Sequence, residues 1–266
     1  MKVFEVILNS GIDAREARLL LAEVAGFSQA SLAASPDEEV PFEVENAFLE
    51  LVKRRAEGEP VAYLLGRKEF YGLDLSVNPS VLIPRPETEL LVDLALQRNP
   101  ASVLDLGTGS GAIALALKHE RPSWKVVAVD ADLAALQTAR RNATKLNLDV
   151  DFRHGRWFEP VAGERFDLVL ANPPYVAAGD PHLLALRHEP QSALVGGPDG
   201  LQEIRKITSQ VGEYLRPGAW LLLEHGLGQD GAVRDLLGEA GLASVTTWPD
   251  LAGIARVSGG NRGGKG

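Results

Sequence analysis

The N-terminal part of the chain shows apolar positions at helical spacing only. A helix is predicted to begin after Asp13, a residue typical of the N-cap, and to end at Gly26. Its apolar stripe consists of Ala17, Leu20, Leu21 and Val24. A second helix is predicted from Pro41 to the basic residues 53–55, which suit the negative end of the helix dipole. These helices form either a cap on the rest of the chain or a docking module for a macromolecular partner.

The pattern then changes to aromatic and alternating residues around Gly72, which indicates a β-hairpin. Either Glu87 or Thr88 can start the next helix, which is predicted to run to about Arg98. We therefore divide the chain into three parts: a helical domain (1–66), a hairpin linker (67–82) and a larger domain (83–266).

Strand and helix patterns alternate from residue 101 onward. The predicted strands cover residues 102–105, 125–129, 150–154, 166–171, 218–224, 243–248 and 254–258. The predicted helices cover residues 111–120, 132–147, 200–215 and 229–240. Such alternation predicts a parallel sheet with helices on both faces, and the last two strands, joined by a short connection, must be antiparallel. We therefore predict an α/β fold with a seven-stranded, mostly parallel, doubly wound sheet. The glycine-rich tail, residues 258–266, is expected to be mobile.

Composition narrows the possible functions. The 266 residues carry a formal net charge of −9, which argues against a protein that mainly grips duplex nucleic acid. The absence of cysteine excludes disulfides and cysteine nucleophiles, and the five histidines show no metal-ligand spacing. No apolar run approaches the roughly 20 residues of a membrane helix, and no signal peptide is evident. We expect a soluble cytoplasmic protein.

The tetrapeptide Asn172-Pro173-Pro174-Tyr175 follows the apolar run 166–171, so it lies just past the carboxyl end of a predicted strand. Ligands bind at that edge in open α/β sheets. The Asn172 side-chain oxygen and the Pro173 carbonyl are two acceptors on a stiff backbone, and they suit a planar NH2 group. The alternative is a plain Pro-Pro loop with Asn172 as a cap.

A glycine-rich loop indicates a nucleoside-type cofactor. The segment Asp105-Leu106-Gly107-Thr108-Gly109-Ser110-Gly111 leads from a predicted strand into a helix, and glycines let the backbone approach a ligand closely. Asp130 ends the second predicted strand, where a carboxylate can accept both ribose hydroxyls. The spacing also fits the dinucleotide fingerprint of NAD-dependent oxidoreductases. Against a dehydrogenase, the sequence offers no clear set of hydride-transfer partners.

Together, these residues resemble the S-adenosylmethionine-dependent methyltransferases that act on planar nitrogen. Among them, the match is closest to the peptide chain release factor glutamine N5-methyltransferases. The matching segments cover nearly the whole chain: Glu69-Phe70-Tyr71-Gly72, Leu82-Ile83-Pro84-Arg85-Pro86-Glu87-Thr88-Glu89, Asp105 to Leu115, Asn172 to Val176, and Leu221-Leu222-Leu223-Glu224-His225-Gly226. The resemblance implies a class I methyltransferase-like sheet and the cofactor S-adenosylmethionine, released as S-adenosylhomocysteine. It also implies a substrate, the glutamine of the Gly-Gly-Gln motif in class-1 release factors.

The resemblance further implies roles for individual residues. The expected cofactor-binding residues are Asp105, Gly107, Thr108, Gly109, Ser110, Gly111, Asp130, Trp157 and Asn172. The expected substrate-binding residues are Arg85, Glu89, Asn172, Pro173, Pro174 and Tyr175. Asn172, Pro173 and Tyr175 are the expected catalytic residues, because two acceptors take the glutamine N–H hydrogens and the ring forms a wall. No metal is expected, since a sulfonium already carries an activated methyl group.

One position departs from the family. An acid usually stands directly before the position of Trp157, where it can bond the adenine amino group, but this chain has Arg156. An arginine side chain cannot accept a hydrogen bond. Stacking on Trp157 is therefore expected to carry more of the adenine recognition.

Two further hypotheses remain open. An adenine-N6 DNA methyltransferase uses a similar tetrapeptide on a flipped base, but it needs a target-reading domain and a basic groove. A nucleoside-binding scaffold without turnover would not need an intact Asn172-to-Tyr175 segment. We expect a monomer that acts on a release factor, without direct contact to nucleic acid or a membrane.

Overall fold

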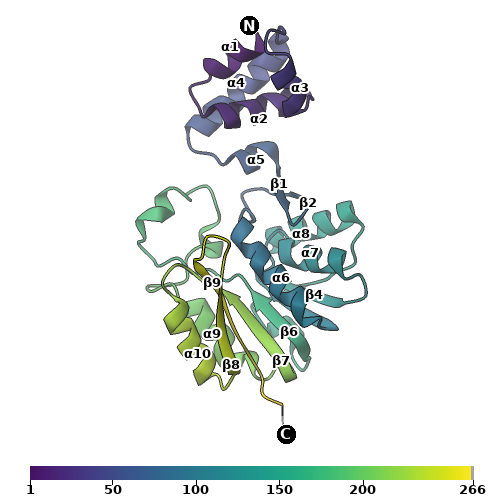
Figure 1. Cartoon of the computed structure of the whole chain (residues 1–266), viewed down its shortest axis with the longest axis vertical. Coiled ribbons are helices and arrows are strands. Elements are labelled where there is room, and N and C mark those ends of the chain that lie inside the picture. The colour runs from purple at the N-terminus through teal and green to yellow at the C-terminus, as the bar shows by residue number, and fades with distance from the viewer. Residues whose placement is uncertain (265–266) are drawn as a thin grey trace. The chain divides into compact units, whose positions relative to one another are not determined.

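The computed structural model describes residues 1–264 and divides into two compact units, the first from Met1 to Arg67 and the second beginning at Lys68 (Figure 1). The first unit consists of five helices: α1 (Val3–Leu8), α2 (Ala14–Ala25), α3 (Gln29–Ala34), α4 (Phe42–Ala56) and α5 (Val61–Leu65). The remaining residues, 265–266 of the predicted mobile tail, lie outside the described residues.

The two long helices of the first unit, α2 and α4, form where the sequence predicts them. The Asp13 side chain accepts hydrogen bonds from two backbone N–H groups of the first turn of α2, and Gly26 ends the helix in the left-handed conformation. A fully buried Phe48 from α4 packs with the apolar stripe of α2. An ion pair of 2.7 Å between Arg55 and Glu16 also joins the two helices. The short helices α1, α3 and α5 were not predicted, because helices of five or six residues are stabilised by packing more than by propensity.

The second unit combines a small hairpin with a large sheet. The hairpin strands are β1 (Arg67–Phe70) and β2 (Leu73–Ser76). The sheet strands are β3 (Ser102–Leu106), β4 (Lys125–Asp130), β5 (Asp151–His154), β6 (Phe166–Ala171), β7 (Leu215–Glu224), β8 (Ala243–Pro249) and β9 (Ala255–Asn261). The helices are α6 (Glu89–Arg98), α7 (Ala112–Glu120), α8 (Leu133–Leu146), α9 (Gln202–Val211) and α10 (Asp230–Glu239). Single 3₁₀ turns cover Pro86–Thr88, Glu159–Val161, Pro181–Leu184 and Gln191–Ala193.

The hairpin forms at the predicted place. Tyr71 and Gly72 both have positive φ, which is the requirement of a two-residue turn that matches the strand twist. The Glu89 side chain accepts a hydrogen bond from the Tyr71 backbone N–H at 2.9 Å, and the Tyr71 hydroxyl donates to Asp93 at 2.8 Å. The start of α6 therefore supports the strained turn of the hairpin.

The large sheet has the strand order β5-β4-β3-β6-β7-β9-β8, with β9 antiparallel to both neighbours and the other pairs parallel. This confirms the predicted seven-stranded, mostly parallel sheet and the antiparallel pairing of its last two strands. From β3 the chain moves to β4 and β5 on one side, and from β6 it moves to β7 on the other. The point between β3 and β6 is a topological switch point, where open α/β sheets bind their ligands.

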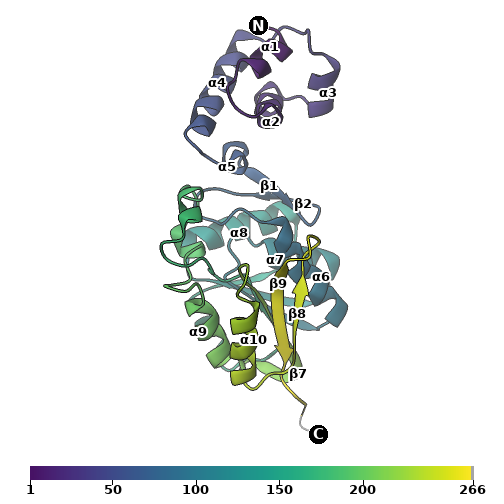
Figure 2. The ribbon, with the colours of Figure 1, turned by 60° about the vertical axis from the view of Figure 1, so that its left-hand side comes forward.

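Helices cover both faces of the sheet, with α6 and α7 on one face and α9 and α10 on the other (Figures 1 and 2). Each face of the sheet carries its own hydrophobic core, and successive residues of β3 point to opposite faces. Val103 packs with α6 and α7, whereas Leu104 and Leu106 pack with α9 and α10. All three side chains are fully buried. Because both faces are covered, the central strands β3, β4, β6 and β7 are mostly apolar in sequence.

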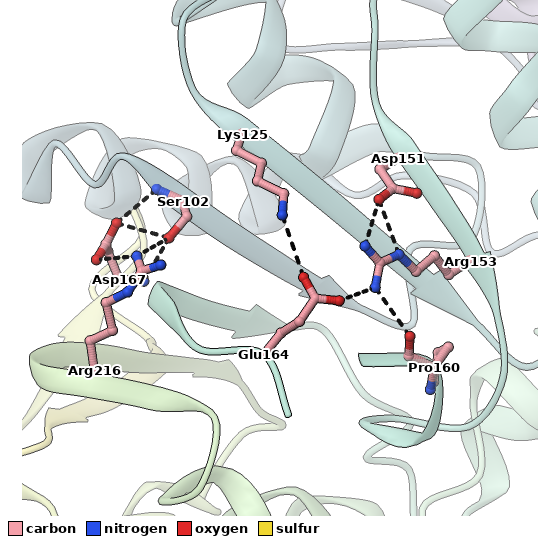
Figure 3. A network of polar contacts seen from close by, with 8 residues as sticks. All are labelled: Ser102, Lys125, Asp151, Arg153, Pro160, Glu164, Asp167 and Arg216. Atoms are coloured by element: carbon pink, nitrogen blue, oxygen red, sulfur yellow. Dashed lines mark hydrogen bonds and ion pairs between the residues drawn. The ribbon is translucent and has the colours of Figure 1, made fainter. Parts of the chain in front are cut away.

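A polar network lies along the amino ends of the parallel strands (Figure 3). Arg216 contacts Asp167 at 2.8 Å, and Asp167 accepts hydrogen bonds from the backbone N–H and the hydroxyl of Ser102. Burial alone would raise the pKa of Asp167, but the bonds from Arg216 and Ser102 lower it. Figure 3 also shows Glu164 joining Lys125 to Arg153. These contacts tie the strands together at the edge opposite to the switch point.

Two boundaries differ from the predictions. The helix predicted over 200–215 is shorter, since α9 ends at Val211 and β7 begins at Leu215. The tail is not mobile as far as Asn261, because β9 pairs with β7 there. A Cβ on Gly259 would lie 2.5 Å from the Leu221 carbonyl oxygen, so the glycines of this segment permit close strand packing.

Candidate active site

A cavity of about 660 Å³ opens at the carboxyl ends of β3, β4, β5 and β6. Its walls come from the loops after these strands, the segment 80–88 before α6, and the segment 190–195 before α9. Nine of the predicted site residues line it: Arg85, Gly107, Thr108, Gly109, Ser110, Asp130, Trp157, Asn172 and Pro174. The other predicted residues, Glu89, Asp105, Gly111, Pro173 and Tyr175, do not line the cavity.

The glycine loop wraps around the end of β3. The backbone N–H groups of Gly107 and Thr108 both donate to the Val129 carbonyl, at 2.8 and 3.0 Å. Gly111 has φ +85°, and a Cβ there would lie 3.2 Å from the Ala139 Cβ of α8. The glycines therefore allow the loop to turn back onto β4 and allow α7 to begin close to α8.

Asp105 lies beneath this loop and is fully buried. Its Oδ2 accepts a hydrogen bond from the Thr108 hydroxyl at 2.6 Å, and its Oδ1 has no partner among the described residues. Burial raises the pKa of the Asp105 carboxyl to about 7, against the effect of the Thr108 bond. The residue braces the loop from below, and its predicted contact with a cofactor stays a prediction.

Asp130 ends β4 and faces the cavity. One carboxylate oxygen accepts from the Gly109 backbone N–H at 2.8 Å, and the other accepts from the Asp132 backbone N–H at 2.9 Å. Burial raises the pKa of this carboxyl, and the backbone bonds oppose that shift. Each oxygen keeps a second lone pair, so Asp130 can accept two further hydrogen bonds from a ligand.

Trp157 forms another wall of the cavity and has a positive φ of 49°. A Cβ on Gly107 would lie 3.4 Å from the Trp157 ring, so the indole packs against the glycine loop. Its Nε1–H donates to Glu203 at 2.9 Å. The same carboxylate accepts from Arg156 at 3.2 Å and from Lys206 at 2.6 Å.

Glu203 was not predicted from the sequence. It is a buried acid in the first turn of α9 that lines the cavity, and no local motif singles it out. Burial would raise the pKa of Glu203, but its hydrogen bonds with Lys206, Arg156 and Trp157 lower it. Glu203 therefore holds the Trp157 ring in place by a hydrogen bond and forms an ion pair with Arg156.

Asn172 begins the loop after β6. Its Nδ2 donates to the Thr88 hydroxyl at 3.1 Å, so Oδ1 is left as an acceptor on a residue that lines the cavity. Pro173 is buried. Tyr175 points away to Glu224, to which its hydroxyl donates at 3.2 Å, and burial raises the pKa of the phenol above its usual range. The predicted role of Tyr175 as a substrate wall stays a prediction.

The segment before α6 is held by a second buried acid. Glu189 accepts a hydrogen bond from the Ile83 backbone N–H at 3.0 Å and pairs with the Arg85 guanidinium. Arg85 is thereby fixed at the cavity wall, whereas Glu89 supports the hairpin turn. Their predicted contacts with a substrate stay predictions.

Two kinds of site are absent from the described residues. No cluster of three or more His, Cys, Asp or Glu side chains could hold a metal ion there. None of the helices described is long and apolar enough to cross a membrane.

The cavity suits S-adenosylmethionine. Its lining combines a glycine loop that a ligand can approach closely, a carboxylate at the end of β4 and an indole wall, and these are groups that can receive a nucleoside-type cofactor. A methyltransferase from Pyrococcus furiosus shares the fold, with a TM-score of 0.60 at 20% identity over 79% of this chain and 99% of that chain. A 16S rRNA methyltransferase of T. thermophilus, solved in complex with AdoMet and guanosine, has a TM-score of 0.53 at 24% identity over 74% of this chain and 49% of that chain.

The fold and the cavity define a class I, S-adenosylmethionine-dependent methyltransferase. A family model described as "Methyltransferase small domain" matches residues 86–188, and one described as "PrmC N-terminal domain" matches residues 8–66. Release factor glutamine methyltransferases are 52% identical in Xylella fastidiosa, over 80% of both chains, and 46% identical in Burkholderia pseudomallei, over 96% of this chain and 94% of that one. The chain belongs to the release factor glutamine methyltransferases. These matches give no support to the adenine-N6 DNA methyltransferase or the NAD-dependent oxidoreductase.

Proposed function

We propose that this chain transfers a methyl group from S-adenosylmethionine to the side-chain amide nitrogen of the glutamine in the Gly-Gly-Gln motif of class-1 release factors. The observation that carries the proposal is the orientation of Asn172. Because its Nδ2 is engaged with Thr88, its Oδ1 is the atom that can accept from a ligand. An acceptor at the end of β6 suits the NH2 group of a glutamine, and the names of the relatives support this substrate.

The chemistry requires the amide nitrogen to be oriented. That nitrogen is a poor nucleophile, because its lone pair is delocalised into the carbonyl group. When bound, S-adenosylmethionine supplies an activated methyl group on a sulfonium. Asn172 Oδ1 and the Pro173 carbonyl would hold the two N–H hydrogens, which aligns the nitrogen and stabilises the positive charge that grows on it.

The cofactor would be held by the opposite walls of the cavity. The loop from Gly107 to Gly111 would contact the methionine part, and Asp130 would accept the ribose hydroxyls. Trp157, fixed by Glu203, would stack on the adenine. Glu203 already accepts from four side chains, so Trp157 would contribute more to adenine recognition than any acid near residue 156.

The N-terminal unit would dock the release factor. Three of its phenylalanines are exposed, Phe4 at 44%, Phe27 at 53% and Phe42 at 73%, so apolar side chains are available to a protein partner. We further propose that the enzyme acts as a monomer in the cytoplasm and makes no direct contact with nucleic acid, in keeping with its net charge of −9.

The test is to incubate the protein with methyl-labelled S-adenosylmethionine and a purified release factor, and to locate the label by mass spectrometry. We expect the label on the glutamine of Gly-Gly-Gln. A release factor with asparagine in place of that glutamine is the control and should stay unlabelled. Label on another residue, or equal labelling of the control, would refute the proposed substrate.

A further inference from the structure

Thr88 is a buried threonine whose hydroxyl bonds to a distant part of the chain. It directly precedes α6, yet its side chain makes no capping hydrogen bond. The residue is only 4% exposed, and its hydroxyl instead accepts from Asn172 Nδ2, 84 positions later in the chain. Thr88 ends the 3₁₀ turn that runs into α6 and has helical φ and ψ (−68°, −20°), so its hydroxyl is free of a capping role and serves the loop after β6.

Glu224 is the second unusual residue. It ends β7, beside β6, and is 1% exposed. Its Oε1 accepts from the Tyr175 hydroxyl, and its Oε2 is a buried acceptor with no hydrogen-bond partner among the described residues. The register of β6 and β7, in which Ala171 pairs with Leu223, places Glu224 beside Asn172 and hence near Thr88. Burial raises the pKa of Glu224 to about 7, and Thr88 is the first of the groups that oppose this shift. Arg256 also lowers the pKa, whereas Glu87 raises it.

A hydroxyl has one hydrogen to donate and two lone pairs with which to accept. If the Thr88 hydrogen is directed to the Glu224 carboxylate, its oxygen can only accept from Asn172. The Asn172 amide must then present Nδ2 to Thr88 and keep Oδ1 free. Without this constraint the amide could turn over, and its NH2 group would face the NH2 group of the substrate.

We propose that Glu224 and Thr88 are positioning residues that set the orientation of the Asn172 side-chain amide. The carboxylate orients the hydroxyl, and the hydroxyl selects the amide nitrogen. The same carboxylate accepts from the Tyr175 hydroxyl, so in this arrangement one buried acid supports Tyr175 directly and Asn172 through Thr88. This inference rests on the proposed function, in which Asn172 Oδ1 accepts from the glutamine.

The test is a double-mutant cycle on the full-length enzyme, with kcat on intact release factor as the measurement. Thr88→Val keeps the shape and removes the hydroxyl, and we expect kcat to fall about 10- to 100-fold, with Kd for S-adenosylmethionine unchanged. Thr88→Ser should restore most of the activity. In an Asn172→Ala background, Thr88→Val should cost less than about 2-fold, because its effect passes through Asn172.

Thr208→Val is the matched control. Thr208 is as buried as Thr88, but its hydroxyl bonds to backbone carbonyls within α9, so this variant should keep normal kcat. Thermal unfolding of every variant shows whether it is folded. A normal kcat for Thr88→Val, or an equal loss with and without Asn172, would overturn the positioning role while the proposed function stands. Near-normal activity of Asn172→Ala would overturn both.

Discussion

Replacing Asp130 by alanine tests the cofactor site directly. In the structure each carboxylate oxygen accepts a backbone hydrogen bond, and Asp130 lines the cavity. A ribose hydroxyl that donates to this carboxylate contributes roughly 1.5–3 kcal/mol, the range for a hydrogen bond to a charged group. Since 1.4 kcal/mol corresponds to tenfold in Kd, we expect S-adenosylmethionine to bind about 10- to 150-fold more weakly.

In the Asp130→Ala variant, the backbone N–H groups of Gly109 and Asp132 lose their carboxylate acceptor but can bond to water instead. Gly109 is partly exposed and Asp132 is exposed, so water can replace the lost carboxylate at both. The loss of binding should therefore exceed the loss of stability. This separates a direct ligand contact from a general collapse of the glycine loop.

Isothermal calorimetry with S-adenosylmethionine and with S-adenosylhomocysteine measures the change. Thermal unfolding of the ligand-free variant measures any structural damage. Asp149→Ala, at an exposed aspartate before β5, is the control and should bind normally. A change in Kd below about twofold for Asp130→Ala, or preferential binding of NAD by the wild type, would refute the assigned role.

Three further predictions concern turnover, pH and the N-terminal unit. Asn172→Ala should lose at least about 10²-fold in kcat with little change in cofactor binding, because a positioning contact is removed; near-normal turnover would contradict this. Burial raises the pKa of both Asp105 and Glu224 to about 7, so the folded chain binds these two protons more tightly than the unfolded chain does. The free energy of unfolding is therefore expected to fall as pH rises through 7, where the buried carboxyls must ionise. Thermal unfolding at pH 6 and pH 8 should show this loss in the wild type and a smaller one in Asp105→Asn and Glu224→Gln; an identical pH dependence in all three would exclude it. A fragment that begins near Glu69 should bind S-adenosylmethionine almost normally and methylate intact release factor much more slowly, while matching the full chain on a short Gly-Gly-Gln peptide. An equal fractional loss on protein and peptide would show that the unit is a stabilising cap.

The sequence by itself determined most of the fold. Strand–helix alternation predicted a seven-stranded, mostly parallel sheet, the short connection after β8 predicted an antiparallel end, and Gly72 marked the hairpin. These features follow from a few neighbouring residues, because side-chain periodicity and the φ preference of glycine are local properties. The same holds for the candidate site, since a motif at the carboxyl end of a parallel strand must lie at the binding edge of the sheet.

Only the tertiary structure decided which side chains support that site. In the sequence Thr88 is an ordinary helix cap, Glu203 an ordinary acid in the first turn of a helix, and Glu224 the polar end of a strand. Their partners lie 84, 46 and 49 positions away, so no local pattern could reveal them. The tail is a similar case, because its glycines suggest mobility until β7 is placed beside them. These side chains become buried only when distant segments of the chain pack together. Because buried polar groups require hydrogen-bond partners, that packing decides which of them bond to one another.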